Sequence, residues 1–230
     1  MPMDNYTKKN RTSRNRSTMP APLPISTITQ PSPYSRELVD KLLPFAEVKR
    51  ILARKRLFLS TGQKNYCYLI LSGQVILHRD DDDLAMTTIN APSLIGVGNM
   101  ATRSMNGYIK LLTTSDIGIL SLERTFDIIR ENDLWELLTM HMMVVTSKLY
   151  ASNKMLTAPT SYDIIKSQLI ELMSENEKYR NNITAENYIR DKTNLSRSGI
   201  MRILSELKEG GYIEINRGIL IKVHQLPEKF

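Results

Sequence analysis

The sharpest alternation of apolar and polar positions in this chain lies near its C-terminus, between residues 183 and 223. Four apolar side chains there recur at the i, i+3, i+4 and i+7 spacing that marks one buried helix face. They are Ile200, Ile203, Leu204 and Leu207. A separate arc of the same helix carries Arg197, Ser198, Met201, Arg202 and Ser205. We therefore predict a helix that packs on a core with one side and presents hydrogen-bond donors on the other.

The residues that flank this helix predict its two ends and a shorter helix before it. Thr184 and Ser196 can each N-cap a helix, because a hydroxyl oxygen there accepts from backbone N–H groups of the first turn. Gly210 and Gly211 follow the last apolar position, where many helices end in a residue with positive φ. The two predicted helices are separated by a tight turn, which is the arrangement of a helix-turn-helix.

A β-hairpin is predicted directly after the second helix. Residues 212–215 and 219–223 are strand-prone, and the turn Asn216-Arg217-Gly218 between them supplies a glycine for a positive φ. A helix-turn-helix followed by a hairpin is the winged-helix plan, with Arg217 at the tip of the wing. The alternative is a small helical hairpin whose charged face is only solvated. The apolar pattern, the caps and the hairpin agree with one another, and together they favour DNA binding.

The side chains of the predicted winged helix suit two kinds of contact with a DNA duplex. Arginine can bond bidentately to guanine in the major groove, and serine can bond to several bases. We expect base edges to be read by Arg197, Ser198, Met201 and Arg202. We expect the phosphate backbone to be contacted by Thr184, Ser196, Ser205, Lys208 and Arg217.

Upstream, residues 34–132 have the pattern of a β-rich domain. Short strand-prone runs alternate with turns, at residues 47–52, 55–60, 66–71 and 74–79. The four consecutive aspartates at 80–83 repel one another out of any core and predict a hairpin tip. Aspartates in a row on a turn do not converge on one ion, so we expect no metal site there.

A second helical pattern begins at residue 133. Apolar residues recur there at steps of three and four, which is the heptad seam of a helix that pairs with another helix. The apolar seam positions are Trp135, Leu138, Met142, Val145, Leu149 and Leu156. We expect residues 133–158 to form a dimerisation helix, and the alternative is a single helix that covers the β-rich domain. Pro159 ends the pattern, and residues 159–230 form the predicted winged domain.

The net charge of +7 is concentrated in residues 1–33, where five basic side chains stand against one aspartate. This segment is rich in Thr, Ser, Asn and Pro, and we expect it to be a disordered basic tail. In residues 161–230, 11 basic side chains meet 10 acidic ones. The DNA prediction therefore rests on where the charges lie and not on their sum.

Other features of the sequence limit the class of protein. No apolar run approaches the length of a membrane span, and no apolar segment follows the basic N-terminus as it does in a secretory signal. The only cysteine is Cys67, which excludes an intramolecular disulfide and a cysteine-ligated iron–sulfur cluster. The sequence contains no phosphate loop, histidine-rich metal cluster or nucleophile elbow. We expect a cytoplasmic protein that is not an enzyme and that has no metal or cofactor.

Two stretches resemble the Crp/Fnr superfamily of bacterial transcription regulators. LSRSGIMRILSELKEGGYI is similar to its DNA-binding signature, with Arg197 and Arg202 at the two arginine positions. YLILSGQVIL is similar to a strand pair of its sensor domain. The resemblance implies an α+β fold: an N-terminal β-roll of the cyclic-nucleotide-binding, jelly-roll type, a long dimerisation helix and a C-terminal winged helix-turn-helix. Many members have a glutamate where Ser198 stands, so the family's base specificity does not carry over.

The same resemblance argues against control by cyclic AMP in the usual mode. Members that bind cyclic nucleotides have a glutamate after the glycine that matches Gly96, and an arginine that pairs with the phosphate. Here Val97 replaces the glutamate, and Met105-Asn106 stand where the arginine is expected. The candidate pocket for another effector consists of Gly96, Val97, Arg103, Met105, Asn106 and Tyr108. With these ligand-binding residues missing, the sequence most resembles an enterobacterial group of the superfamily that includes an inhibitor of hydrogen peroxide resistance.

Together these patterns predict a transcription regulator that binds a near-palindromic DNA operator as a homodimer, with RNA polymerase as a further candidate partner. One rival interpretation is a regulator gated by an unidentified small molecule or a redox change. Another is a protein-binding module whose DNA binding is vestigial. Cys67 lies in a strand-prone run, which favours an inert buried thiol over a redox sensor.

Overall fold

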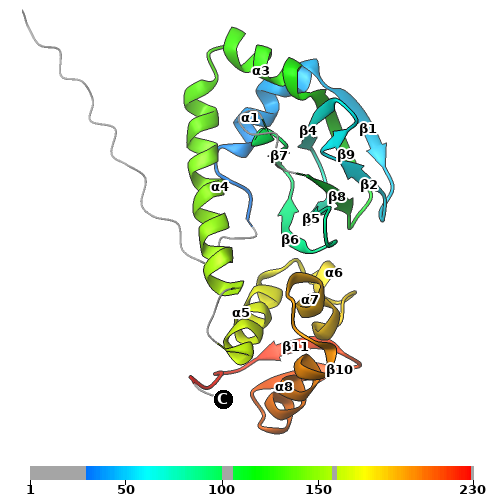
Figure 1. Ribbon diagram of the computed structural model, residues 1–230, viewed down its shortest axis with the longest axis vertical. Coiled ribbons are helices and arrows are strands. Elements are labelled where there is room, and N and C mark those ends of the chain that lie inside the picture. The colour runs from blue at the N-terminus through cyan, green and yellow to red at the C-terminus, as the bar shows by residue number, and fades with distance from the viewer. Residues whose placement is uncertain (1–29, 100–105, 157–159, 229–230) are drawn as a thin grey trace, which may run out of the picture.

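The computed structural model describes residues 30–99, 106–156 and 160–228, without the side chains of residues 154–156. Residues 1–29, Arg103 and Met105 lie outside this part of the chain, as does the side chain of Leu156. Figure 1 shows a β-rich domain at one end, a winged domain at the other and helix α4 (Trp135–Leu156) running beside the β-rich domain. The expected α+β fold is therefore confirmed, whereas the exact limits of its domains stay predictions.

The β-rich domain is made of two antiparallel sheets. One has the strand order β1-β9-β4-β3 with β7 also paired to β4, and the other has the order β2-β8-β5-β6. The strands are β1 (Glu47–Ile51), β2 (Arg56–Phe58), β3 (Ser60–Thr61), β4 (Lys64–Ile70), β5 (Gln74–Arg79), β6 (Ala85–Asn90), β7 (Ser93–Ile95), β8 (Gly107–Leu111) and β9 (Ser115–Ser121). The aspartates at 80–83 lie between the paired strands β5 and β6, which confirms the predicted hairpin tip.

The core of this domain forms two layers because successive side chains of a strand point to opposite faces. Between the sheets lie the apolar residues Leu59, Tyr68, Ile70, Val75, Leu77, Ile95, Ile109, Leu111 and Ile117. The outer face of the first sheet is covered by α1 (Ser35–Leu42), the 3-10 turn η2 (Leu43–Phe45), α3 (Leu122–Glu131) and the first turns of α4. Cys67 is fully buried in this second layer, as predicted.

The winged domain contains the two predicted helices and the predicted hairpin. Its elements are α5 (Ser161–Ser174), α6 (Glu177–Arg180), α7 (Ala185–Lys192), α8 (Arg197–Glu209), β10 (Ile213–Asn216) and β11 (Ile219–Val223). The apolar stripe of α8 packs into one cluster with α5 and α7, and both Ile200 and Leu207 are fully buried. The helical period therefore identified the buried face of α8 correctly.

The two domains touch through the second sheet. Helix α7 packs against strand β6, and Gln74 on β5 donates a hydrogen bond to Glu175, which follows α5. Packing also begins ahead of residue 34, because Ser32 is buried and its carbonyl accepts from the backbone N–H of Ser35. In the described part of the chain, no helix combines the length and the apolar character that a membrane crossing needs.

Candidate nucleic-acid interface

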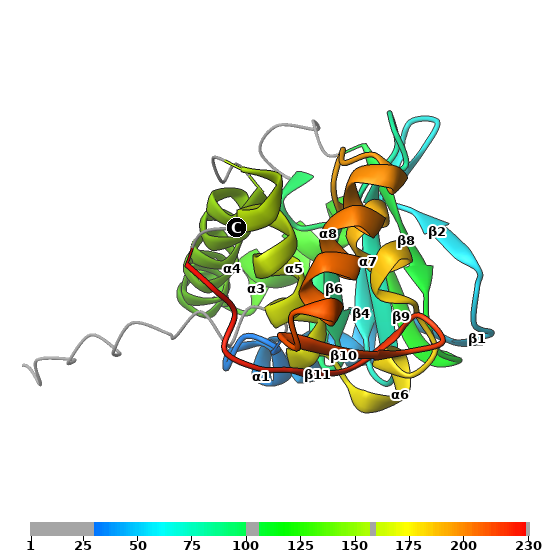
Figure 2. The ribbon, with the colours of Figure 1, turned by 90° about the horizontal axis from the view of Figure 1, so that it is seen from below.

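Helix α8 presents the side chains that were predicted to read DNA. Ser196 caps it, because its Oγ accepts from the backbone N–H of Gly199 at 3.2 Å. The buried face of α8 packs on α5, α7 and β10. Figure 1 places α8 at the end of the molecule away from the β-rich domain, and Figure 2 looks onto that end. One face of the helix is thus fixed by packing, and the opposite face lies on the surface of the molecule.

All four predicted base-reading side chains are exposed on α8. The side chains of Arg197 and Arg202 are 73% and 69% exposed. Met201 is 48% exposed, and Ser198 is exposed beside it. Because residues one helical turn apart share a face, these positions form one continuous strip opposite the buried stripe. Such a strip can enter a major groove without any rearrangement of the core.

Both arginines have acidic partners in the free protein. Arg197 Nε lies 3.7 Å from Glu186 Oε1, and Arg202 Nη1 lies 3.3 Å from Glu206 Oε1. Glu186 also pairs with Arg190 at 2.8 Å. The Arg202–Glu206 pair is exposed on both sides and contributes little to stability, whereas the Glu186 carboxylate is only 11% exposed and is shared by Arg190 and Arg197. The i, i+4 spacing of Arg202 and Glu206 is a signal that the sequence carries, whereas the pair between α7 and α8 depends on the fold.

The wing is fastened to the start of α7. Thr184 caps α7 by accepting from the backbone N–H of Asn187 at 3.2 Å, and the N–H of Ala185 donates to the carbonyl of Gly218 at 2.8 Å. A Cβ at Gly218 would lie 2.9 Å from Thr184 Cγ2, so the close approach requires glycine. Arg217 and Gly218 both have positive φ, as the two central residues of a type I′ turn do.

The remaining candidates for phosphate contact lie on α8, at the wing tip and at the start of α7. Arg217 is exposed at the wing tip, and Ser205 and Lys208 are exposed on α8. The Ser205 hydroxyl donates to Glu209 Oε1 at 3.1 Å. Thr184 is only partly exposed, because its side chain caps α7 and packs against the wing. Its structural task is therefore clear, and its contact with phosphate stays a prediction.

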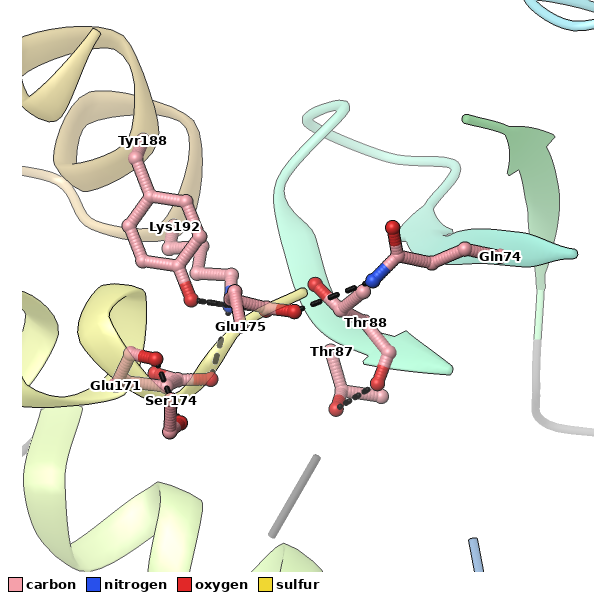
Figure 3. A network of polar contacts seen from close by, with 8 residues as sticks. All are labelled: Gln74, Thr87, Thr88, Glu171, Ser174, Glu175, Tyr188 and Lys192. Atoms are coloured by element: carbon pink, nitrogen blue, oxygen red, sulfur yellow. Dashed lines mark hydrogen bonds and ion pairs between the residues drawn. The ribbon is translucent and has the colours of Figure 1, made fainter. Parts of the chain in front are cut away.

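A buried polar network holds the helix-turn-helix against the β-rich domain (Figure 3). The side chain of Glu175 has no exposed surface and accepts from Gln74 Nε2 at 3.3 Å and from the Tyr188 hydroxyl at 3.2 Å. Lys192 Nζ lies 2.9 Å from Glu171 Oε1 and 3.9 Å from Glu175 Oε1. Burial raises the pKa of Glu175, and the charge of Lys192 partly offsets that rise.

Nothing in the sequence pattern marks this network. Residues 174–182 have the composition of a polar connection, and a single glutamate among them carries no sign of burial. Its partners come from a strand about a hundred residues upstream and from α7, so only the fold reveals them.

The predicted effector residues are only partly brought together. Gly96 and Val97 line a cavity of about 320 Å³ between α4 and strands β6 and β7. Asn106 is exposed and lies outside the described lining of this cavity, while Arg103 and Met105 fall outside the described residues.

Tyr108 is a correction to the predicted pocket. Its strand neighbour Ile109 points into the core between the sheets, so Tyr108 must point to the opposite face. There its ring stacks on His78 with the centroids 4.9 Å apart, and its hydroxyl donates to Asp83. The alternation of side chains along the strand predicts that Tyr108 and Ile109 point to opposite faces. The sequence alone did not show which of these faces adjoins the cavity.

The predicted dimerisation seam of α4 faces the β-rich domain over part of its length. Leu138 is buried in the core layer beneath α4, and Met142 packs against that layer. Val145 and Leu149 line the cavity farther along the helix. The first half of the seam therefore packs against the β-rich domain of the same protomer, and the second half borders the cavity.

The first and last positions of the seam differ from the rest. Trp135 is 39% exposed and packs edge-on against Phe126, with the ring centroids 5.3 Å apart. The backbone of Leu156 ends α4. Apart from the seam, α4 exposes Met143 and Tyr150, which are 54% and 76% exposed.

The Cys67 thiol is expected to be inert in the folded protein. Burial raises its pKa to about 12, so almost none of it is thiolate at neutral pH. Iodoacetamide at neutral pH should leave the native protein unlabelled by mass spectrometry and should label the protein fully in denaturant. Rapid labelling of the native protein would contradict this prediction and revive the redox-sensor interpretation.

Relatives of known name match most of the chain. Residues 161–228 match the family model described as winged helix-turn-helix DNA binding. The inhibitor of hydrogen peroxide resistance of Salmonella typhimurium is 31% identical over 178 residues, which cover 76% of this chain and 86% of that protein. The protein of the same name from Escherichia coli K12 is 28% identical over 205 residues, which cover 84% of this chain and 99% of that protein.

Solved structures share the fold at low sequence identity. The global regulator CLP of Xanthomonas campestris, described as responsive to c-di-GMP, has a TM-score of 0.67 at 16% identity and covers 83% of this chain and 100% of its own. A Crp/Fnr-family transcriptional regulator of Thermus thermophilus has a TM-score of 0.57 at 17% identity and covers 76% and 94%. At these identities the likeness shows the shared architecture alone: a β-roll, a long helix and a winged helix-turn-helix.

Proposed function

We propose that this chain recognises a near-palindromic operator as a homodimer. The premise is its family: the chain belongs to the Crp/Fnr superfamily and, within it, to the group of the inhibitor of hydrogen peroxide resistance. Membership makes the chain a DNA-binding transcription regulator and not an enzyme. The proposal adds how the operator is read, which assembly reads it and which side chains make the contacts.

The observation that carries the proposal is the exposed strip of α8. Arg197, Ser198 and Arg202 project from a helix whose opposite side is fully packed and whose N-terminus is capped. This geometry lets the first turns of α8 enter a major groove, where the two guanidinium groups reach base edges. The capped start of α8, Lys208 and the wing tip then contact phosphates on either side of that groove.

Selection of binding sites from random duplexes tests the proposal directly. The full chain should enrich a motif with two related half-sites whose centres are about 34 Å apart, because two copies of α8 enter successive turns of one face of the duplex. Competition with unselected duplexes should show a large preference for the enriched motif. Binding without any enriched motif would instead support a protein-binding module with vestigial DNA affinity.

We propose that α4 joins the two protomers along its seam. Leu149 is a seam residue and is 47% exposed, whereas the adjacent Tyr150 lies a further 100° around the helix and is 76% exposed. A charge placed at Leu149 would be buried in a seam contact, which is costly unless the charge is paired. A charge at Tyr150 would stay in water if the seam is the contact.

Sedimentation of two matched variants distinguishes the possible faces. We expect the wild-type chain and Tyr150→Glu to sediment as dimers and Leu149→Glu to sediment as a monomer at micromolar concentration. The reverse result would move the contact to the face of Tyr150. A monomeric wild-type chain would contradict the dimer proposal altogether.

The cellular setting follows from the same proposal. A regulator that reads bacterial operators works in the cytoplasm, and RNA polymerase bound at a neighbouring promoter is the natural further partner. Whether the operator overlaps the promoter or lies upstream of it decides between repression and activation.

A further inference from the structure

The cavity between α4 and strands β6 and β7 has mostly apolar walls. Its volume of about 320 Å³ is in the range of small-ligand pockets. Apolar side chains from β5, β6, β7 and α4 and from the segment after β7 line it, among them Ile89, Ile95, Val97, Met142 and Val145. None of its described lining residues is acidic. Besides the amides of Gln30 and Asn90 and several hydroxyl groups, a histidine and a lysine line it, both from α4.

The first is His141, which is only 1% exposed. Its Nδ1 lies 3.5 Å from Ser35 Oγ, and its Nε2 has no hydrogen-bond partner among the described residues. Burial and the nearby Lys148 lower the pKa of His141 to about 4, so the ring is neutral at physiological pH. Nδ1 accepts from the Ser35 hydroxyl when the ring proton is on Nε2, and Nε2 is then a buried donor without a described partner, on the helix that walls the cavity. Buried donors are seldom left unpaired in folded proteins.

The second is Lys148, which lies two turns farther along the same face of α4. It donates to the carbonyl of Gln30 and forms no ion pair with a carboxylate in the described part of the chain. Lys148 is only partly exposed, and burial lowers the pKa of its ammonium group. A partly buried cation without a counter-charge favours an anion beside it.

We propose that this cavity binds a carboxylic acid with an apolar chain. The chain would lie against the apolar walls, and the carboxylate would accept a hydrogen bond from Lys148 Nζ. A cyclic nucleotide fits poorly, because the described lining holds no carboxylate to accept from ribose hydroxyls and only one lysine or arginine. The role of the acid as an effector rests on the proposed function, whereas its binding does not.

Strand β6 connects this cavity to the DNA-binding domain. Residues 87–90 of β6 line the cavity, while α7 packs against the same strand. Thr88 of β6 lies beside the buried Glu175 in Figure 3. A ligand that fixes the spacing of α4 and β6 therefore acts on the strand that supports the helix-turn-helix.

Calorimetric titration of the full chain with decanoate and with decanol tests the inference. These probes have the same apolar chain, and only decanoate carries the anion. We expect decanoate to bind at least about tenfold more tightly than decanol, because hydrogen bonds to charged groups are among the stronger ones. Lys148→Met should remove this preference, and Lys41→Met, which replaces an exposed lysine of α1, should preserve it.

Several outcomes would overturn the inference. Equal affinity for the two probes, no binding of either, or a preference that survives Lys148→Met would each do so. If Lys148→Met does not fold, Val145→Trp serves in its place, because it fills the cavity and should abolish binding of both probes. Operator selection runs without any probe, so a chain that selects its motif but ignores decanoate refutes this inference and leaves the proposed function intact.

Discussion

Replacing Lys192 with methionine is expected to lower the free energy of unfolding by about 3–5 kcal/mol, because the change leaves buried carboxylates without their cation. The side chain of Lys192 is 4% exposed, and its partners Glu171 and Glu175 are 11% and 0% exposed. Methionine replaces most of the aliphatic stem but lacks the ammonium group, whose Nζ donates to the Tyr188 hydroxyl at 2.6 Å and lies 4.2 Å from the centre of its ring. The loss therefore measures mainly the contacts of the ammonium group with the two carboxylates and with Tyr188. Chemical denaturation followed by circular dichroism provides the measurement.

Two further variants show whether the effect comes from the buried site. Lys178→Met removes an exposed lysine from α6 and should change stability by less than about 0.5 kcal/mol. Adding Glu175→Gln to Lys192→Met should recover much of the loss, because a neutral amide can still bond to Gln74 and Tyr188. A loss below about 1 kcal/mol in the first variant would mean that the network behaves as a surface ion pair.

The stability of the Lys192 variant should also depend on pH. Burial already raises the pKa of Glu175 above its value in the unfolded chain, and the loss of the cation raises it further. A carboxyl group with a raised folded pKa favours folding while it is protonated and loses that contribution as the pH rises through the folded pKa. The deficit relative to wild type should therefore be smaller near pH 5 than near pH 8.

The winged domain was predictable because its signals are local. Thr184 and Ser196 each cap a helix that begins at the next residue, and Gly218 has the positive φ that its own turn needs. The buried stripe of α8 follows from a period of 3.6 residues, which requires no knowledge of the partner elements. Helix α3 was not predicted, although Ser121 caps it with an N–H···O distance of 3.2 Å at Arg124. Its buried residues Leu122, Thr125, Ile128 and Ile129 have helical spacing, so the sequence did carry a signal for this helix.

The contacts that the sequence did not reveal join residues far apart in the chain. Gln74 and Glu175 are separated by 101 positions, and no local pattern pairs them. Tyr108 was misplaced for a related reason, since a period of two fixes opposite faces but not which face borders α4. The heptad of α4 was real as a pattern, yet Leu138 shows that part of it serves packing within the protomer. A period therefore identifies an apolar face without naming what covers it.

Replacing Arg202 with alanine is expected to reduce the discrimination between the selected operator and random duplexes by about 1–3 kcal/mol. The side chain is 69% exposed and its only ion pair in the described residues is with Glu206, so the fold should not be affected. An arginine that reads guanine contributes to the correct sequence alone, and its loss leaves non-specific affinity largely unchanged. Fluorescence anisotropy with both duplexes at several salt concentrations measures the two affinities separately.

Lys208→Ala is the matched control, because Lys208 is exposed on the same helix and is predicted to contact phosphate. Its loss should weaken binding to both duplexes alike and reduce the slope of log affinity against log salt by about 1. If Arg202→Ala behaves in the same way, Arg202 is a phosphate contact and the proposed register of α8 in the groove is wrong. If discrimination falls instead, the selection of binding sites is repeated with the Arg202→Ala variant. The position at which the selected motif no longer prefers one base is the base pair that Arg202 contacts. That position then fixes the depth and direction of α8 in the groove, and with them the bases within reach of Arg197 and Ser198.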